Sequence, residues 1–315
     1  MIRLVRTQRM RAPSSFVTIT RSGGLIAMAI VVVLMGAYGP DSDLLAIRKA
    51  GEALKPLQKE MPPAQKGDWV LDHPESGQTF DKYLKSNPNR PQGKRTTLYV
   101  QPLGEFRGRD KKSFDLTVEM LAIFYNMPVK TLGPIDLKIL PDSARRVHPK
   151  WGMKQVDSLA ILELLRKNRP VDAVGVLGLT ATDLWPNEKG RAWNFVFGQA
   201  SLGDRVGVWS TARLGNPETV DKLFLQRTLK VAIHETGHML GIYHCLSYEC
   251  GMNGSNSLTE SDRQIMPFCS ECEMKIWWSC GTQIAERYKK LEVFAEQNDL
   301  DSEAKFWKSS AGILK

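Results

Sequence analysis

The stretch His234-Glu235-Thr236-Gly237-His238-Met239-Leu240-Gly241-Ile242-Tyr243-His244 predicts a helix that ends in a turn and carries metal ligands. His234 and His238 are four residues apart, so both imidazoles project from one face of a helix. Gly241 favours the left-handed conformation at which helices stop, and His244 follows the turn. Two histidines on one helix face are more often ordinary core or surface residues. Three histidines, a glutamate and a glycine at this spacing instead indicate a zinc site.

Three protein ligands leave a fourth position for water, which is typical of catalytic rather than structural zinc. Zinc lowers the pKa of a bound water and polarises a carbonyl group. Glu235 is the candidate general base, which takes the proton from this water and passes it to the leaving amine of a peptide bond. The sequence therefore predicts a zinc-dependent metallopeptidase. The alternative is a catalytically silent, zinc-stabilised binding or scaffold protein, which would not need a carboxylate at position 235.

The cysteines form a second group of candidate ligands, because all five lie between positions 245 and 280. Two close pairs have the spacing of a four-cysteine structural zinc site, and their members are Cys245, Cys250, Cys269 and Cys272. Such a site would hold the loop that follows His244. Two disulfides or buried thiols are the alternative reading. Cys280 has no obvious partner. The sequence predicts two zinc ions in each chain, one catalytic and one structural.

The histidine motif, continued through Cys245, Cys250, Met252 and the pair Cys269 and Cys272, resembles the archaemetzincin family of zinc metallopeptidases, which belongs to the metzincin clan. The resemblance extends upstream to the runs 178–184 and 193–202, and in all covers roughly residues 68–290. It implies that His234, His238 and His244 bind the catalytic zinc, that Glu235 is the general base and acid, and that the four cysteines bind the second zinc. It also implies that Met252 is the Met-turn residue beneath the catalytic metal, with Met266 as the fallback. The spacing between Met252 and Cys269 is one residue shorter than is usual in the family.

The N-terminal segment predicts a secretory signal peptide or a membrane anchor. Five arginines precede the first acidic residue, and residues 23–39 are uncharged and almost wholly apolar. At this length the run is at the short limit for a membrane-spanning helix, and a buried core helix is the remaining alternative. We therefore expect an exported protein, periplasmic or extracellular, or one held at the membrane through residues 23–39. The whole chain has a net charge of +9, of which the five arginines of this segment supply +5. The rest of the sequence has only a mild basic excess and no basic and aromatic stripe, so nucleic acid is not an expected partner.

The expected domain organisation is a signal peptide or anchor at 1–39, a linker at 40–67, a metallopeptidase domain at 68–298 and a C-terminal extension at 299–315. Helical spacing favours helices at 78–85, 114–125, 156–167, 219–240, 282–297 and 300–307. Apolar runs favour strands at 96–102, 132–140, 173–179, 194–200 and 206–210. This order predicts an α+β protein with a metzincin-like mixed twisted sheet, helices packed on it, and a small four-cysteine subdomain near the C-terminus.

The run Gly207-Val208-Trp209-Ser210 is the candidate edge strand above the zinc, where an extended peptide substrate could add to the sheet. A buried central strand is the alternative at these residues. His73 and His148 lie far from the motif without ligand spacing, so we expect surface residues without a role. The expected partner is a peptide or protein substrate, and the chain is expected to be a monomer.

Overall fold

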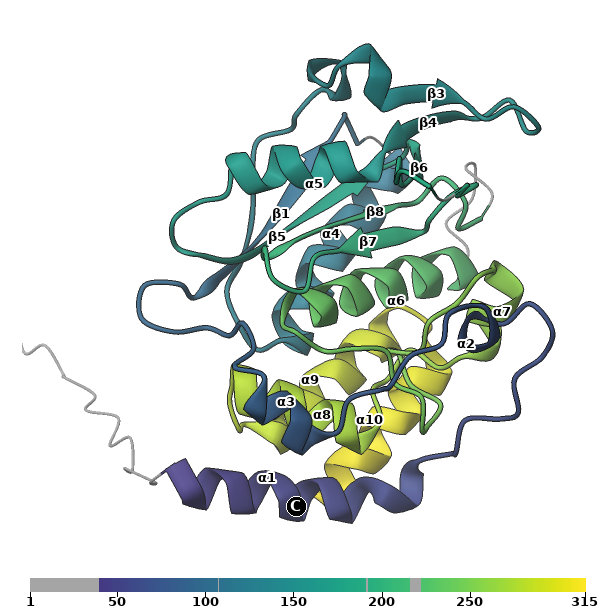
Figure 1. Ribbon diagram of the computed structural model, residues 1–315. Coiled ribbons are helices and arrows are strands. Elements are labelled where there is room, and N and C mark those ends of the chain that lie inside the picture. Colours follow the sequence, from purple (N-terminus) through teal and green to yellow (C-terminus); the bar gives the residue numbers. More distant parts are fainter. Residues whose placement is uncertain (1–39, 107, 191, 216–221) are drawn as a thin grey trace, which may run out of the picture. The chain divides into compact units, whose positions relative to one another are not determined.

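The computed structural model describes residues 40–106, 108–190, 192–215 and 222–315, and these lie within one compact unit (Figure 1). The apolar run 23–39 lies outside the described residues, so export or membrane anchoring stays a prediction. Among the residues that are described, none of the helices combines the length and the apolar character that crossing a bilayer requires.

The main sheet has five strands in the order β2-β1-β5-β8-β7. The four strands β2, β1, β5 and β8 run parallel, and β7 pairs antiparallel with β8 at the edge. Their bounds are Val129–Thr131 for β2, Thr97–Leu103 for β1, Ala173–Thr180 for β5, Val206–Ser210 for β8 and Gly198–Ala200 for β7. A smaller sheet, in the order β3-β4-β6, is formed by Arg145–Val147, Lys154–Asp157 and Asp183–Trp185. The predicted mixed sheet is therefore confirmed.

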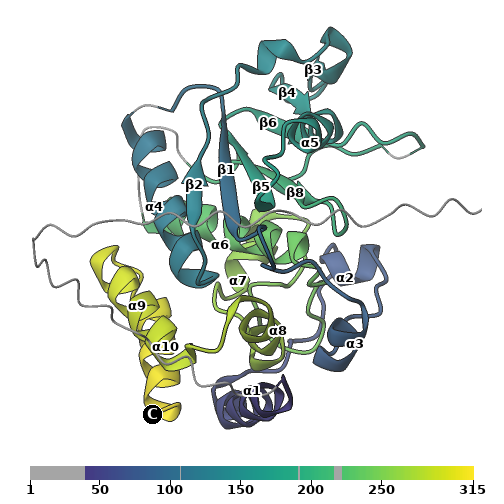
Figure 2. The ribbon, with the colours of Figure 1, turned by 90° about the vertical axis from the view of Figure 1, so that its left-hand side faces the viewer.

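Helices cover both faces of the main sheet (Figures 1 and 2). On one face, α5 (Ser158–Lys167) buries Ile161 and Leu165 against β5 and β8. On the other face lie α4 (Gly108–Phe124) and α6 (Lys222–Met239), which pack on each other. The central strands β1 and β5 are buried along their whole length because alternate side chains enter the two separate hydrophobic cores. This packing holds α6, the helix with the histidine motif, firmly beneath β7 and β8.

The helices of the C-terminal region lie on the far side of α6 from the sheet (Figure 1). They are α7 (Leu258–Arg263), α8 (Ser270–Cys280), α9 (Ile284–Gln297) and α10 (Asp301–Ile313), of which α10 packs along α9. Buried Trp307 on α10 belongs to the same hydrophobic core as α4 and α6. The predicted C-terminal extension is thus a helix joined to the main core.

Residues 40–67, expected to be a linker, instead contain the helix α1 (Pro40–Leu54), which packs on α8, and a short 3-10 turn at Lys55–Leu57. Ile47 and Leu54 are buried there. A Cβ at Gly51 would stand 2.9 Å from Cγ of Met274 on α8, so the glycine permits the close approach of the two helices. The short helices α2 (Trp69–Asp72) and α3 (Phe80–Lys85) follow. The many prolines of this region separate short helices and do not leave the chain without structure.

Two strand predictions are wrong. Residues 132–140 do not form a strand, since β2 ends at Thr131 and the later residues contain 3-10 turns at Leu137–Ile139 and Asp142–Ala144. Their apolar side chains pack on the second core from a loop, so the apolar pattern reflects burial without strand pairing. The run 207–210 is not an edge, because β8 is buried between β5 and β7. The edge strand above the motif is β7.

Candidate active site and metal centres

The first two candidate ligands lie on the last turns of α6, as predicted. Nε2 of His234 and Nε2 of His238 are 3.0 Å apart. The helix ends at Met239, and Gly241 follows with φ +82°. A Cβ at Gly241 would also stand 2.9 Å from Cβ of Pro88, so glycine is required here by conformation and by space. The turn places Nε2 of His244 3.2 Å from Nε2 of His238.

Nε2 of His238 has, from each of the other two Nε2 atoms, the separation that a shared zinc ion requires, and ligand atoms of the three rings all lie within 4.8 Å of one another. Nitrogen ligands about 2.05 Å from a tetrahedral zinc are about 3.3 Å from one another. Each ring also has a hydrogen-bond acceptor for its other nitrogen, Nδ1, at 2.9 Å or less. The acceptors are the carbonyl oxygen of Gly251 for His234, that of Ile242 for His238, and the carboxylate of Glu75 for His244. With the proton held on Nδ1, the lone pair of each Nε2 is free for a metal.

Two of these imidazoles are held neutral. Burial, followed by the charges of the neighbouring histidines, lowers the pKa of His234 well below its usual value. Burial and the charge of His244 lower the pKa of His238 to about 3. Because only a neutral imidazole binds a metal ion, these two residues are prepared for metal binding at neutral pH.

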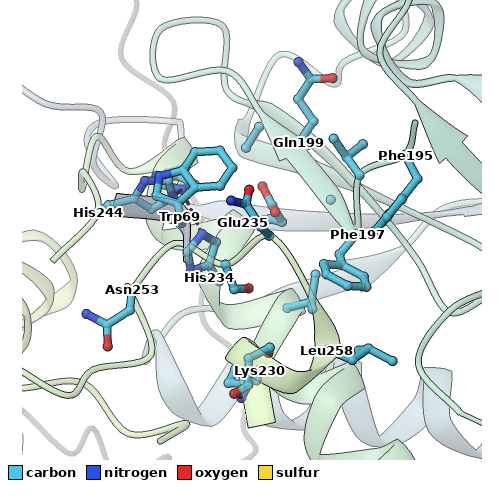
Figure 3. Close-up of a pocket in the computed structure, with 18 of the residues that line it drawn as sticks. Trp69, Phe195, Phe197, Gln199, Lys230, His234, Glu235, His244, Asn253 and Leu258 are labelled. Carbon is cyan, nitrogen blue, oxygen red and sulfur yellow. Dashed lines mark hydrogen bonds between the residues drawn. The ribbon is translucent and has the colours of Figure 1, made fainter. Parts of the chain in front are cut away.

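Glu235 points into the same cavity and is only 5% exposed (Figure 3). Burial raises the pKa of its carboxyl group to about 8. Its Oε2 atom has no hydrogen-bond partner among the described residues. A buried, unpartnered carboxyl oxygen beside the metal ligands is positioned to exchange a proton with a water or a substrate.

Two glycines allow the close packing around this glutamate and the ligands. A Cβ at Gly198 on β7 would stand 2.7 Å from Cδ of Glu235, and a Cβ at Gly237 would stand 2.6 Å from Sδ of Met252. Met252 is fully buried, and its closeness to Gly237 places it directly against the turn of α6 that carries His234 and His238. The spacing of the motif singles out neither glycine.

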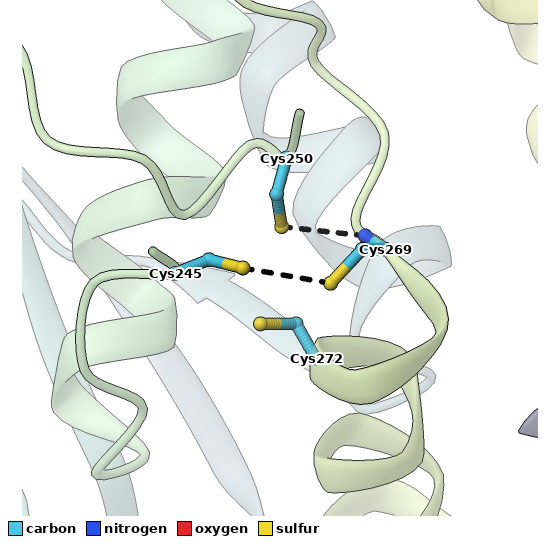
Figure 4. Close-up of side chains that lie close together, drawn as sticks. All are labelled: Cys245, Cys250, Cys269 and Cys272. Carbon is cyan, nitrogen blue, oxygen red and sulfur yellow. Dashed lines mark hydrogen bonds between the residues drawn. The ribbon is translucent and has the colours of Figure 1, made fainter. Parts of the chain in front are cut away.

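The candidate structural site brings together the sulfur atoms of Cys245, Cys250, Cys269 and Cys272 (Figure 4). Sγ of Cys245 and Sγ of Cys269 are 3.7 Å apart, which matches about 3.8 Å between ligands of a tetrahedral zinc with Zn–S bonds of about 2.3 Å. It is far from the length of a disulfide bond. None of the five cysteines forms a disulfide bond in the structure. The donor set and its spacing therefore fit zinc and not two disulfides.

Backbone groups support this cysteine cluster. The N–H groups of Met252 and Cys269 donate to Sγ of Cys250, over 3.4 Å and 3.3 Å. Such hydrogen bonds favour the thiolate form, which is the form that binds zinc, and they oppose the burial that raises the pKa of the Cys250 thiol well above its usual value. Cys280, at the end of α8, lies outside the cluster, and burial raises the pKa of its thiol to about 12.

The cavity at the histidines has a volume of about 530 Å³. Its upper wall is the segment 192–200, which includes β7, and its floor is the face of α6 from Arg227 to His238. Loop residues after the Met252 turn and Trp69 on α2 complete the wall. The cavity thus lies between a sheet edge and the candidate metal ligands.

The upstream segment that contains Trp69 and Asp72 also reaches this cavity. The ring of His73 stacks between Trp69, at 3.9 Å, and Trp193, at 5.6 Å between ring centroids. His73 is therefore not an isolated surface residue. His148, also expected at the surface, is buried, and its Nδ1 accepts hydrogen bonds from the backbone N–H groups of Lys150 and Trp151.

The sequence of this chain is similar to those of known proteins. The model of Peptidase family M54 matches residues 130–277, which include all three histidines and the four clustered cysteines. Archaemetzincin-2 of Rattus norvegicus is 32% identical over 303 residues, which cover 84% of this chain and 83% of the relative. Archaemetzincin-2 of Homo sapiens is 32% identical over 293 residues, which cover 82% of this chain and 79% of the relative. The crystal structure of an archaemetzincin from Methanopyrus kandleri has 32% sequence identity, covers 59% of this chain and 96% of that chain, and has a TM-score of 0.48.

Proposed function

This chain belongs to the archaemetzincins, a family of metallopeptidases, and on that premise we propose that it hydrolyses peptide bonds at a zinc ion held by His234, His238 and His244. The observation that carries this proposal is the convergence of the Nε2 atoms of three histidines beside the buried carboxyl group of Glu235. When bound, zinc would supply a Lewis acid that makes water more acidic and polarises the peptide carbonyl group.

Glu235 is the proton carrier in this proposal. Burial alone keeps its carboxyl group protonated at neutral pH, whereas a nearby cation favours the carboxylate. Oε2, which has no partner among the described residues, accepts the proton of the attacking water and donates it to the amine that leaves. Glu235 is only 5% exposed, which favours proton transfer between its carboxyl group and the reacting groups.

The substrate binds in extended form along the edge strand β7. The register with β8 aligns Gly198 with Trp209, Gln199 with Val208 and Ala200 with Gly207. The N–H of Ser201 donates to the carbonyl oxygen of Val206, and the N–H of Ser210 donates to that of Phe197. In segment 197–201, the backbone N–H and C=O groups of the odd-numbered residues therefore point toward β8. The backbone groups of Gly198 and Ala200 therefore face the cavity, where a peptide can add a further strand.

The second zinc is bound by Cys245, Cys250, Cys269 and Cys272 and has a structural role. Cys245 immediately follows His244, so the four thiolates hold the segment that supplies the third histidine. A closed four-sulfur site has no position for water and contributes to folding. We therefore propose two zinc ions per chain with separate tasks.

The test compares the wild type with Glu235→Ala and Glu235→Gln, with a broad peptide library as substrate and metal analysis of each protein. Both variants should lose at least about 10²-fold in the rate of hydrolysis. Both should keep two zinc ions, since Glu235 is not a proposed ligand. A wild type that binds zinc but cleaves nothing in the library would favour the scaffold alternative.

A further inference from the structure

The segment 68–78, upstream of the region that the family model matches, is fastened to the loop that carries His244. At one end of the segment, the backbone N–H of Trp69 donates to Oε1 of Glu260 over 2.8 Å. At the other end, Nε2 of Gln78 donates to the carbonyl oxygen of Gly241 over 3.0 Å, and Oε1 of Gln78 accepts from the N–H of Tyr243. One end of the segment is therefore held by α7, and the other by the turn that precedes the third histidine.

Between these two attachments, Glu75 contacts His244 directly. Both carboxylate oxygens of Glu75 lie 2.9 Å from Nδ1 of His244. The indole Nε1 of Trp69 donates to Oε1 of Glu75 over 3.1 Å. The ring of Trp69 also meets the ring of His244 edge-on, with the centroids 5.1 Å apart (Figure 3). Trp69 thus holds the carboxylate and the imidazole in one arrangement.

This contact distinguishes His244 from the other two histidines. His234 and His238 donate to neutral backbone carbonyl groups of the motif region itself. Only His244, among the three, has a carboxylate as its acceptor, and that carboxylate comes from 169 residues away in the sequence. A hydrogen bond to a carboxylate is stronger than one to a carbonyl group, fixes the ring orientation and makes the ligating nitrogen more basic.

The tryptophan itself has a tightly defined place. A Cβ at Gly254 would stand 2.6 Å from Cγ of Trp69, so this glycine, two residues after Met252, makes room for the indole. The side chain of His244 is mostly shielded, with 13% exposed, whereas that of Glu75 is 31% exposed. The partial burial of the imidazole strengthens the contact on its side.

We propose that Glu75 is a positioning residue of the histidine site, which acts through His244 and makes metal affinity depend on the docking of segment 68–78. This inference rests on the proposed zinc site and extends it to a residue that the histidine motif does not contain. Glu75 does not touch the metal position or the substrate in this role. It fixes the tautomer and the direction of the third ligand.

The test measures metal binding with full-length Glu75→Ala and Glu75→Gln, by competition for zinc with a chromophoric chelator. Loss of a residue that orients a metal ligand typically costs 10–100-fold in affinity. We expect the zinc affinity of the histidine site to fall about 10–100-fold in Glu75→Ala and less in Glu75→Gln, which keeps a neutral acceptor. The affinity of the four-cysteine site should not change.

Cobalt substitution supplies a readout that a general loss of stability would not move. Cobalt bound by nitrogen and cobalt bound by four thiolates absorb differently, so each site is followed separately. The spectrum of the histidine site should shift in Glu75→Ala while the thiolate-to-cobalt bands stay as in the wild type. Thermal unfolding with excess zinc shows whether each variant is folded.

Asp68→Asn is the matched control, since Asp68 lies in the same segment and pairs with Arg263 without contact to a metal ligand. It should weaken the histidine site far less than Glu75→Ala. Equal zinc affinities in Glu75→Ala, Asp68→Asn and the wild type would overturn the inference and leave the proposed function standing. A wild type that holds no metal at the histidines would overturn both.

Discussion

Gly198 on β7 and Glu235 on α6 lie so close that a side chain at position 198 cannot be accommodated beside the glutamate. A Cβ there would stand 2.7 Å from Cδ of Glu235 and 2.8 Å from its Cγ. The absence of a side chain on the edge strand therefore sets where the proposed proton carrier lies. It also places the backbone of Gly198, which faces the substrate cavity, next to that carboxyl group.

Gly198→Ala should consequently lower the rate of hydrolysis by about 10²-fold, because displacement by about 1 Å can cost that much in a catalytic site. Zinc content should stay at the wild-type value, since neither residue is a proposed ligand. Gly203→Ala, in the β7–β8 turn, is the control because a Cβ there meets nothing within 4 Å. Equal rates for the two variants would show that Glu235 has room to move.

The cysteine cluster leads to a second prediction. Cys272→Ser should remove one zinc ion per chain and lower the free energy of unfolding by about 4 kcal/mol or more, as the loss of a structural metal does. Hydrolysis should also fall, since Cys245 adjoins His244. Metal analysis and urea unfolding provide the measurements.

Cys280→Ser is the matched control for this experiment. Cys280 lies on α8 like Cys272 but outside the group of four sulfur atoms. The Cys280→Ser protein should keep two zinc ions and nearly the free energy of unfolding of the wild type. If the Cys272 and Cys280 variants bind the same amount of zinc, the cluster is not a metal site.

The parts of the site that could be predicted from the sequence are those set by local geometry. His234 and His238 converge because a helix repeats every 3.6 residues, and Gly241 turns the chain toward His244. Strand pairing is not local in this sense. The apolar residues of 206–210 predict a strand, but they do not show that β7 pairs with its outer side.

The contact between Glu75 and His244 shows the same limit more strongly. No periodicity connects residue 75 with residue 244, and the segment around Glu75 has the prolines and short helices of a lead-in. The carboxylate becomes recognisable only when the fold brings Trp69 and Glu75 onto the loop after α6. Gly198, likewise, has no distinguishing local pattern.

The edge strand offers a third prediction. Proline is tolerated on the open side of an edge strand, where its missing N–H breaks no bond of the sheet. The Ala200→Pro protein should therefore fold, but it lacks the backbone N–H that faces the cavity. We expect KM for an extended peptide to rise about 10-fold, which corresponds to the loss of one hydrogen bond of about 1.4 kcal/mol. Val208→Pro, in the buried strand β8, should instead unfold the protein. Unchanged KM in a folded Ala200→Pro protein would argue against substrate binding along β7.

Lys230 provides a prediction about pH. It lies one turn before His234 on α6, and its ammonium group donates to the carbonyl oxygens of Ser261 and Gln264 near the end of α7. Burial lowers the pKa of Lys230 from 10.5 to about 8. At pH values between about 8 and 10.5, Lys230 is protonated in the unfolded chain but has lost its proton in the folded protein. The free energy of unfolding therefore rises with pH in this range.

The free energy of unfolding of the wild type should therefore rise relative to that of Lys230→Met by about 2–3 kcal/mol from pH 8 to pH 10.5, and the difference should be constant below about pH 8. Urea unfolding of both proteins at several pH values, with zinc present, measures this difference, in which the titration of all other groups cancels. Lys289→Met, at an exposed position on α9, should show no such change. A difference that stays constant over the whole range would mean that Lys230 remains protonated in the folded protein, and that the two carbonyl groups offset its burial.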